Sequence, residues 1–411
     1  MDFKVDRVVP KPVDTDTEEG RKLRQEIRDF LKKNLTPEVL AEREAYYAGG
    51  LHTKEYRRKH AATGWTAPVA SPRWPKEYGG VERSEVESQV IAEELGRSGV
   101  GGGGIGTGIV APVIMRHGTE EQKREWFPRI ARGEIEFSLG YSEPNAGTDL
   151  ASLEMRAVPD GDDYIINGQK VYSTYAHSAT HHWLAARTDP DVEQHRGISL
   201  FVVDLASPGI TIRPLWTMAD ERTNEVFYDD VRVPRKNLIG EANQGWGILR
   251  EALSYERTVV GSIVPGGAGG RRSILDELIE YAMETERNGR PLAKDPVVRQ
   301  NLAQLAIDSS LRRLHGYRTA WMMSKGIVPE VEASMQKVWA NELDQRMANT
   351  GLQILGLYGQ LEPGSKWASL EGKIEHLYRF AVHLTYGGGS HELMRNIMAT
   401  RGMGLPREPR L

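Results

Sequence analysis

The 411-residue sequence contains no cysteine. This absence excludes disulfide bonds, thiolate metal sites and cysteine nucleophiles, and it suits a reducing compartment. The sequence also lacks any run of eighteen apolar residues, which excludes a membrane span. Its first twenty residues carry charges and prolines where a signal peptide would need an apolar run, so we expect a cytoplasmic protein.

The chain has little excess charge of either sign. Its 53 lysines and arginines against 57 aspartates and glutamates leave a net charge of −4 at pH 7. No block of basic residues is long or isolated enough to indicate a nucleic-acid partner. A composition that is 39 % hydrophobic and 27 % charged is typical of a soluble globular protein. Because the chain is too long for one ordinary hydrophobic core, we expect two or three domains.

The spacing of apolar residues changes twice along the chain. Helical spacing dominates at first, and short β-rich runs follow, including a hairpin turn predicted at Asn167-Gly168. Long amphipathic helices then return, which predicts a bundle. We therefore predict an α+β protein with an N-terminal α-helical domain (1–136), a middle antiparallel β-domain (137–241) and a C-terminal four-helix bundle (242–411). Grooves where such domains meet are common ligand sites.

Several short segments match part of a familiar motif but lack the surrounding residues that the motif requires. Gly99–Gly104 matches G-x-G-x-x-G, but a predicted helix precedes it and no βαβ pattern surrounds it. His181 and His182 are adjacent and would point to opposite faces of a strand, so they cannot share a metal. His391 begins an H-E-x-x pattern whose second histidine is replaced by Arg395. We therefore expect no metal site.

Glu256 is a carboxylate in an apolar setting. Leu249, Ala252 and Leu253 precede it at helical spacing, so Glu256 lies on the apolar face of its predicted helix. Glu251 flanks that face on a more polar side. Carboxylates are almost never fully buried unless they are partnered or functional. Glu256 is thus either a catalytic group or one half of an ion pair with a neighbouring helix.

Four segments of the sequence resemble the acyl-CoA dehydrogenase family, in the same order and spacing. They are Gly118–Leu153, Ile166–Arg187, Val231–Arg257 and Leu377–Arg407. With WPKEYGG near the start, the resemblance covers essentially the whole chain. It implies the acyl-CoA dehydrogenase fold, a bound FAD and α,β-desaturation of an acyl-CoA thioester. It also implies a tetramer that passes electrons to an electron-transfer flavoprotein or a similar acceptor.

The resemblance also implies where the flavin binds. On one side of the site it places Tyr141, Ser142, Thr148, Tyr172 and Thr174. On the other side it places Ser390 and Glu392, and it makes Arg287, Gln353 and Gly356 further cofactor contacts, with Gln353 across a subunit interface.

The residue types are compatible with these roles. Ser142, Gly147 and Thr148 put hydroxyls and bare backbone along a turn-rich loop that can direct donors at a flavin or a phosphate. Tyr172, where the family usually has tryptophan, and Thr174 are two residues apart and would share one face of a strand. The structural alternatives are a plain hairpin connection and a half-buried pair on a strand.

The residue expected to act as the base departs from the commonest family pattern. That pattern is Y-E-G-T near the C-terminus, with the glutamate as base, and here Gly388 occupies its position. A subset that includes isovaleryl-CoA dehydrogenase supplies the base from an L-x-x-E-R motif, which is LSYER here and selects Glu256. The resemblance then implies that Gly388 retains a catalytic role through its N–H, which would hold the thioester carbonyl, and that Arg257 contacts the CoA substrate.

The L-x-x-E-R motif combined with GGGSHE most resembles the catalytic subunits of heterotetrameric dehydrogenases of steroid side-chain degradation. Arg287–Pro291 departs from the family's R-x-x-F-G, keeping the arginine but not the aromatic residue. The resemblance therefore leaves both a homotetramer and a heterotetramer with a homologous chain open. The glycines of Val264–Gly270 indicate either a helix break or a pocket widened for a bulky, branched or steroid acyl group. An acyl-CoA oxidase, a flavin monooxygenase and a non-catalytic partner subunit remain alternatives.

Overall fold

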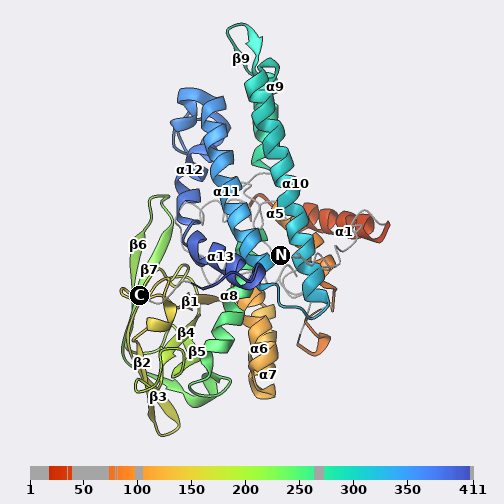
Figure 1. The fold of residues 1–411 in the computed structure, drawn as a ribbon. Helices are drawn as coiled ribbons and strands as arrows, with labels where there is room; N and C mark the ends of the chain where they lie inside the picture. Colours follow the sequence, from red (N-terminus) through yellow and green to blue (C-terminus); the bar gives the residue numbers. More distant parts are fainter. Residues whose placement is uncertain are drawn as a thin grey trace.

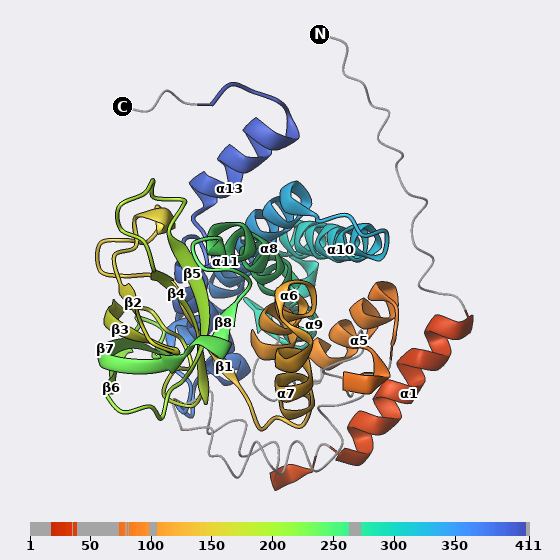
Figure 2. The same ribbon diagram turned by 90° about the horizontal axis from the view of Figure 1, so that it is seen from below.

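The computed structural model describes residues 18–34, 36–38, 74–78, 80, 82–97, 105–262 and 273–407. The predictions made for Gly99–Gly104 and Val264–Gly270 lie outside this part of the chain. A helical section, a β-sheet and a second helical section follow one another along the sequence, as Figures 1 and 2 show. The predicted α+β fold is therefore confirmed. No helix of the described residues is long and apolar enough to cross a bilayer.

The N-terminal section is helical, and two of its helices, α1 (Glu18–Asn34) and α5 (Glu85–Arg97), pack through apolar faces. The section also contains α6 (Ala111–His117) and α7 (Glu120–Ala131). Leu23, Ile27 and Leu31 of α1 form one buried stripe, and they share a small core with Val90 and Ile91 of α5. A π-helical turn (Gly106–Val110) leads into α6.

The middle section is an eight-stranded sheet in the order β6-β7-β3-β2-β4-β5-β8, with β1 pairing to β4. The strands are β1 (Phe137–Gly140), β2 (Arg156–Asp160), β3 (Asp163–Lys170), β4 (His181–Arg187), β5 (Ile198–Asp204), β6 (Ile210–Trp216), β7 (Arg222–Pro234) and β8 (Leu238–Ile239). Strands β1 and β2 lie parallel to β4, and the other pairs are antiparallel.

The predicted hairpin turn at Asn167-Gly168 is wrong, because both residues lie inside β3. The β2–β3 turn instead falls at Gly161-Asp162, between the paired residues Asp160 and Asp163. Asn167 exchanges hydrogen bonds with Asp230 on the neighbouring strand, and the register shifts at Gly168, whose φ is +144°. An Asn-Gly pair can thus serve a β-bulge as well as a turn.

The C-terminal section contains the long helices of the bundle. They are α8 (Gly245–Ser262), α9 (Ile274–Glu284), α10 (Pro296–Ser324), α11 (Glu330–Leu355), α12 (Lys373–His383) and α13 (His391–Ile397). A short hairpin of β9 (Glu286–Arg287) and β10 (Arg290–Pro291) connects α9 to α10. Helix α11 contacts α8, α10, α12 and α13, so it forms the centre of the bundle.

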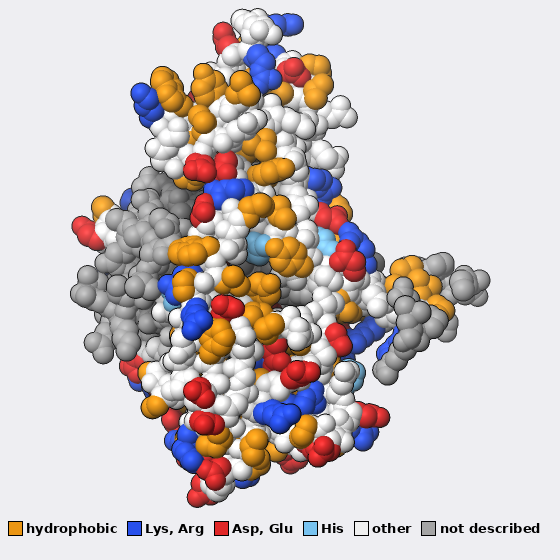
Figure 3. Space-filling model, turned by 90° about the vertical axis from the view of Figure 1, so that its left-hand side faces the viewer, with side chains coloured by type: hydrophobic (Ala, Val, Ile, Leu, Met, Phe, Trp, Pro, Cys, Tyr) orange, Lys and Arg blue, Asp and Glu red, His pale blue; other side chains and the backbone are white. Residues whose placement is uncertain are grey.

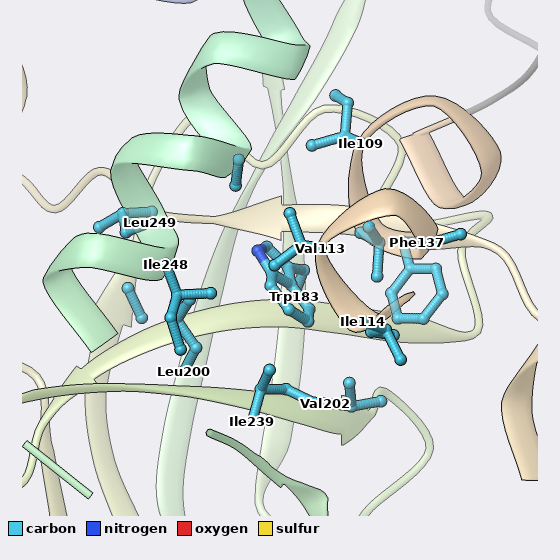
Figure 4. Close-up of a cluster of buried hydrophobic side chains, with 14 of the residues drawn as sticks. Ile109, Val113, Ile114, Phe137, Trp183, Leu200, Val202, Ile239, Ile248 and Leu249 are labelled. Atoms are coloured by element: carbon cyan, nitrogen blue, oxygen red, sulfur yellow. The ribbon is translucent and has the colours of Figure 1, made fainter. Parts of the chain in front are cut away.

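One hydrophobic core joins the sheet to helices of both helical sections. Figure 4 shows Trp183 of β4 and Leu200 of β5 facing Val113 of α6 and Ile248 and Leu249 of α8. Trp183, Leu200, Val113 and Leu249 are completely buried. This packing fixes α8 against the sheet, and α8 is the helix that carries Glu256.

Candidate active site

Helix α8 places the Glu256 carboxylate in the protein interior. Ala252 and Leu249, one and two turns before it, are completely buried in the core. The Oε2 atom of Glu256 is buried without a hydrogen-bond partner among the described residues. Burial raises the pKa of Glu256 to about 7, although the positive charges of Arg257 and Lys337 oppose the rise. The desolvated carboxylate expected from the sequence is therefore present.

The neighbouring Glu251 is fully partnered. Its carboxylate lies 2.9 Å from Nε2 of His117 and 3.2 Å from Nε of Arg116, and it accepts a hydrogen bond from the Tyr255 hydroxyl at 3.1 Å. Glu256 has no comparable ion pair with any described residue. The ion-pair alternative considered for Glu256 thus describes Glu251 instead.

The turn that contains Gly388 comes close to Glu256. Gly388 has a φ of +66° and Gly389 a φ of +102°, a region that disfavours residues with a β-carbon. A β-carbon added at Gly388 would lie 3.3 Å from Oε1 of Glu256 and 3.6 Å from Cε of Lys337. The structure thus brings together two residues that the sequence singled out, Glu256 and Gly388. The Glu256 carboxylate borders the space into which a side chain at 388 would project.

Two buried cations, Lys337 and Arg257, lie close enough to this carboxylate to lower its pKa through their charge. Lys337 of α11 is completely buried, and its Nζ atom donates a hydrogen bond to the carbonyl of Leu384 at 3.0 Å. Burial lowers the pKa of Lys337 to about 8, against the opposing effect of Glu256. Arg257 is also buried, its Nε atom has no partner among the described residues, and burial lowers its pKa.

Sequence reasoning missed Lys337. The signal available was its place on the buried stripe of α11, four residues after Ala333 and three before Ala340, both of which are fully buried. A lysine on such a stripe is unusual because an ammonium group is costly to bury without a partner.

Tyr141 reaches the same region from the loop that follows β1. Its hydroxyl is buried without a hydrogen-bond partner among the described residues. Burial raises the pKa of Tyr141 well above its usual value, and the negative charge of Glu256 adds to the rise. The structure therefore places Tyr141 in the same electrostatic environment as Glu256.

A buried ion pair holds this loop in place. Lys170 Nζ lies 2.6 Å from the Glu143 carboxylate and donates to the carbonyl of Tyr141 at 3.0 Å. Glu143 also accepts from the backbone N–H groups of Glu154 and Met155, at 2.7 and 3.0 Å. Further along the loop, Gly147 has open space beside it.

The two hydroxyl residues of this loop differ in exposure. Ser142 is partly buried, whereas Thr148 is exposed beyond Gly147. A β-carbon at Gly147 would meet no atom within 4 Å. Donors at this end of the loop are thus accessible to a ligand.

Tyr172 and Thr174 do not share a strand face, so that prediction is wrong. Strand β3 ends at Lys170, and Tyr172 has a φ of +57°, which breaks the alternation of a strand. The Thr174 N–H then donates to the Tyr172 carbonyl at 2.9 Å, closing a tight turn. The Tyr172 side chain is 67 % exposed, whereas Thr174 is partly buried with its hydroxyl 3.5 Å from that of Thr223.

The remaining predicted cofactor residues fall into two places. Ser390 caps α13, its Oγ accepting from the N–H of Leu393 at 3.2 Å, and Glu392 is exposed in the first turn of that helix. Arg287 donates to the carbonyl of Ile354 at 2.7 Å, where α11 ends, beside the exposed Gln353 and the partly buried Gly356.

The group at the end of α11 is remote from Glu256 within one chain. Gln353 lies sixteen residues beyond Lys337 on the same helix, and a rise of 1.5 Å per residue separates them by about 24 Å. The structure thus brings Tyr141, Glu256, Lys337 and Gly388 together, and it leaves Arg287, Gln353 and Gly356 apart from them.

Of the adjacent histidines of β4, His182 is held in the interior by two hydroxyl groups. His182 bonds the Tyr228 hydroxyl through Nδ1 at 2.6 Å and the Ser173 hydroxyl through Nε2 at 3.2 Å. It is completely buried, and burial lowers its pKa to about 3. Within the described ranges, no three side chains of His, Asp or Glu converge as metal ligands would.

Three family models match consecutive parts of the chain. The N-terminal domain of acyl-CoA dehydrogenases matches residues 17–134, the middle domain matches 138–231 and the C-terminal domain matches 243–403. Among curated proteins, the acyl-CoA dehydrogenase FadE26 of Mycobacterium tuberculosis is 36 % identical over 404 residues, covering 96 % of this chain and 99 % of that protein. FadE29 of the same organism is 36 % identical over 399 residues, with the same coverage.

Solved structures agree with these matches. The ChsE4-ChsE5 complex from Mycobacterium tuberculosis aligns with a TM-score of 0.82 and 36 % identity, covering 95 % of this chain and 99 % of that one. The Tcur3481-Tcur3483 steroid ACAD aligns with a TM-score of 0.83 and 34 % identity, covering 94 % and 98 %.

Proposed function

This chain belongs to the acyl-CoA dehydrogenase family and is an oxidoreductase of that type, and on this basis we propose that Glu256 is the base that removes the α-proton of its acyl-CoA substrate. The observation that carries the proposal is the buried carboxylate of Glu256, unpartnered at Oε2 and bordered by Gly388. The product of the reaction is the α,β-unsaturated thioester.

The chemistry requires a base of this kind. The proton on Cα is weakly acidic even beside a thioester carbonyl, and a carboxylate with a pKa near neutrality is matched to its removal. Burial raises the pKa of Glu256 to about 7, so the group is partly ionised at neutral pH. The Oε2 atom, which has no hydrogen-bond partner among the described residues, is the proton acceptor in this proposal.

Gly388 contributes through its backbone. Negative charge develops on the thioester oxygen as the α-proton leaves, and an N–H donor fixed in advance stabilises that charge. Gly388 has a left-handed φ and no side chain, and its N–H is proposed as the donor to the substrate carbonyl. The buried cation Arg257, adjacent to the base, is proposed to contact the CoA substrate.

The residues present are compatible with FAD. Tyr172 offers an exposed ring, Tyr141 a buried hydroxyl without a partner among the described residues, and Gly147 an open stretch of backbone. FAD would supply the acceptor for the hydride of Cβ. The residues proposed to hold it are Tyr141, Ser142, Thr148, Tyr172, Thr174, Ser390 and Glu392, with Arg287, Gln353 and Gly356 contacting the FAD of a neighbouring subunit.

We further propose an assembly of four chains and a bulky acyl group, branched or carried on a steroid. One similar structure is described as a complex of ChsE4 and ChsE5, and another as a steroid ACAD. On the face shown in Figure 3, hydrophobic side chains recur from the helical end to the sheet. Tyr378 and Val382 of α12 and Tyr386 beyond it form an exposed stripe, as expected of a surface that contacts another chain. We also predict that the chain assembles with a homologous partner, passes electrons to an electron-transfer flavoprotein and is located in the cytoplasm.

Anaerobic titration of the FAD-loaded protein tests this function. The panel consists of straight-chain, branched and steroid acyl-CoA thioesters, added to the chain alone and to the chain co-expressed with a homologous partner. Bleaching of the flavin absorption by a branched or steroid thioester is expected. Flavin that no thioester of the panel reduces in either preparation would contradict the function, and rapid reoxidation by O₂ would identify an oxidase.

A further inference from the structure

Lys337 carries a positive charge into the centre of the C-terminal bundle. Its side chain is completely buried on α11, and an ammonium group has three hydrogens to donate. Among the described residues, Nζ uses one of them, toward the carbonyl of Leu384 at 3.0 Å. A nearby negative charge stabilises a buried ammonium group that has so few hydrogen bonds, and without one burial favours the neutral amine.

The carbonyl of Leu384 is held from α11 by two side chains. Asn341, one helical turn after Lys337, donates its Nδ2 to the same oxygen at 2.6 Å. Leu384 begins the turn that contains Gly388, and the bond from the His391 N–H to the Thr385 carbonyl, at 2.8 Å, closes that turn. The two donors of α11 therefore fix where the turn begins and so where Gly388 lies.

The same lysine is close to the proposed base. The β-carbon position of Gly388 lies 3.3 Å from Oε1 of Glu256 and 3.6 Å from Cε of Lys337, so both side chains border one point. No direct ion pair joins the two groups, and Oε2 of Glu256 has no hydrogen-bond partner among the described residues. Their charges interact through the interior, where screening by water is weak.

We propose that Lys337 is a positioning residue for the base: it holds the Gly388 turn through the Leu384 carbonyl, and its charge keeps the buried Glu256 carboxylate ionisable at neutral pH. The inference rests on the proposed role of Glu256. The base needs burial for its reactivity, yet burial alone would keep it protonated. Lys337 offsets that tendency without occupying the oxygen that accepts the proton.

The two effects of Lys337 can be separated by variants. Lys337→Gln retains an N–H donor and removes the charge, whereas Lys337→Arg retains both. Asn341→Ala is the matched control, because it removes the other donor to the Leu384 carbonyl and changes no charge. The charged and titratable groups near the pair are Tyr141, Arg257, His383 and His391.

The measurement is an infrared titration of the Glu256 carboxyl group in the full chain as purified, with its partner if it has one. The band is identified by its loss in Glu256→Gln. Lys337→Gln should raise the pKa of Glu256 by about one unit or more, whereas Lys337→Arg and Asn341→Ala should leave it near its original value. An unshifted pKa in Lys337→Gln, or an equal shift in Asn341→Ala, would overturn the proposal.

A reciprocal measurement leaves Lys337 in place, in case its variants do not fold. Coupling between two sites is mutual, so Glu256→Gln should lower the pKa of Lys337, read from its ¹⁵N resonance. An unchanged lysine pKa would again overturn the proposal. Neither titration requires the enzyme to turn over. If the pKa values of Lys337 and Glu256 are coupled in a protein that shows no activity, this result contradicts the proposed function but not the coupling. Normal turnover by Glu256→Gln would contradict both the proposed function of Glu256 and the positioning role of Lys337.

Discussion

Oε1 of Glu256 lies 3.3 Å from the point where Gly388 would place a β-carbon. The two residues come from α8 and from the turn between α12 and α13, which α11 holds near each other. A side chain at position 388 and the carboxylate of Glu256 would therefore compete for one space. The relationship explains how a family member can lack the usual glutamate at this position and retain a carboxylate beside it.

Gly388→Ala is expected to impair the enzyme. Its β-carbon would contact Glu256 tightly, and the φ of +66° would cost about 1 kcal/mol for an L-residue. Displacement of the base or of the Gly388 N–H should lower kcat on the order of tenfold to a hundredfold. Steady-state kinetics measure the effect. Gly247→Ala on α8, where a β-carbon meets nothing within 4 Å, is the control and should leave kcat unchanged.

Tyr172→Ala should weaken FAD binding, because the exposed ring at this position is proposed to stack on the cofactor. The expected loss is about threefold to tenfold in Kd, as for one aromatic contact. Tyr172→Phe keeps the ring and should bind FAD as the original protein does. Fluorescence titration of the FAD-free protein gives both constants, and equal affinities for the alanine and phenylalanine variants would exclude stacking at this residue.

Glu143→Gln should destabilise the protein, because it leaves the charge of Lys170 buried and unpaired. Removing one partner of a buried ion pair costs about 3–5 kcal/mol. Glu134→Gln, in an exposed pair with Arg132, should cost less than about 1 kcal/mol. Urea unfolding of the two variants tests the contrast, and similar midpoints would show that the loop carrying Tyr141 does not depend on this pair.

The pKa of Glu256 also predicts how stability depends on pH. The folded state holds its proton up to about pH 7, whereas the unfolded chain releases it near the ordinary glutamate pKa of 4.5. Because the folded state binds more protons between these values, this group lowers stability as pH rises through that window, and the loss persists above it. Glu256→Gln should therefore gain about 1–3 kcal/mol relative to the original protein between pH 5 and pH 8. Parallel stability profiles for the two proteins would show that the carboxyl pKa is not raised.

The sequence predicted the features that depend on local periodicity. The helical and β-rich sections follow from apolar spacing, and so does the place of Glu256 on the buried face of α8. Two predictions that depended on only a pair of residues were wrong. Asn167-Gly168 serves a bulge instead of a turn, and Tyr172 leaves the strand because of its left-handed backbone.

The role of Lys337 depends on tertiary structure. Its neighbours Leu384 and Glu256 come from distant parts of the chain, and only the packing of α8, α11 and the Gly388 turn brings them together. The periodicity of α11 predicts a buried lysine at this position, but no local pattern predicts which carboxylate or carbonyl it faces.

The most direct test of the account is the rate at which acyl-CoA reduces the flavin in Glu256→Gln, measured by anaerobic rapid mixing. Glutamine retains the size of the side chain but cannot accept the proton, so FAD should bind normally while reduction slows by several orders of magnitude, on the order of 10³-fold. Glu251→Gln, which alters the fully partnered carboxylate on the same helix, should reduce its flavin at a nearly normal rate. Near-normal reduction in Glu256→Gln would contradict the assignment of Glu256 as the base.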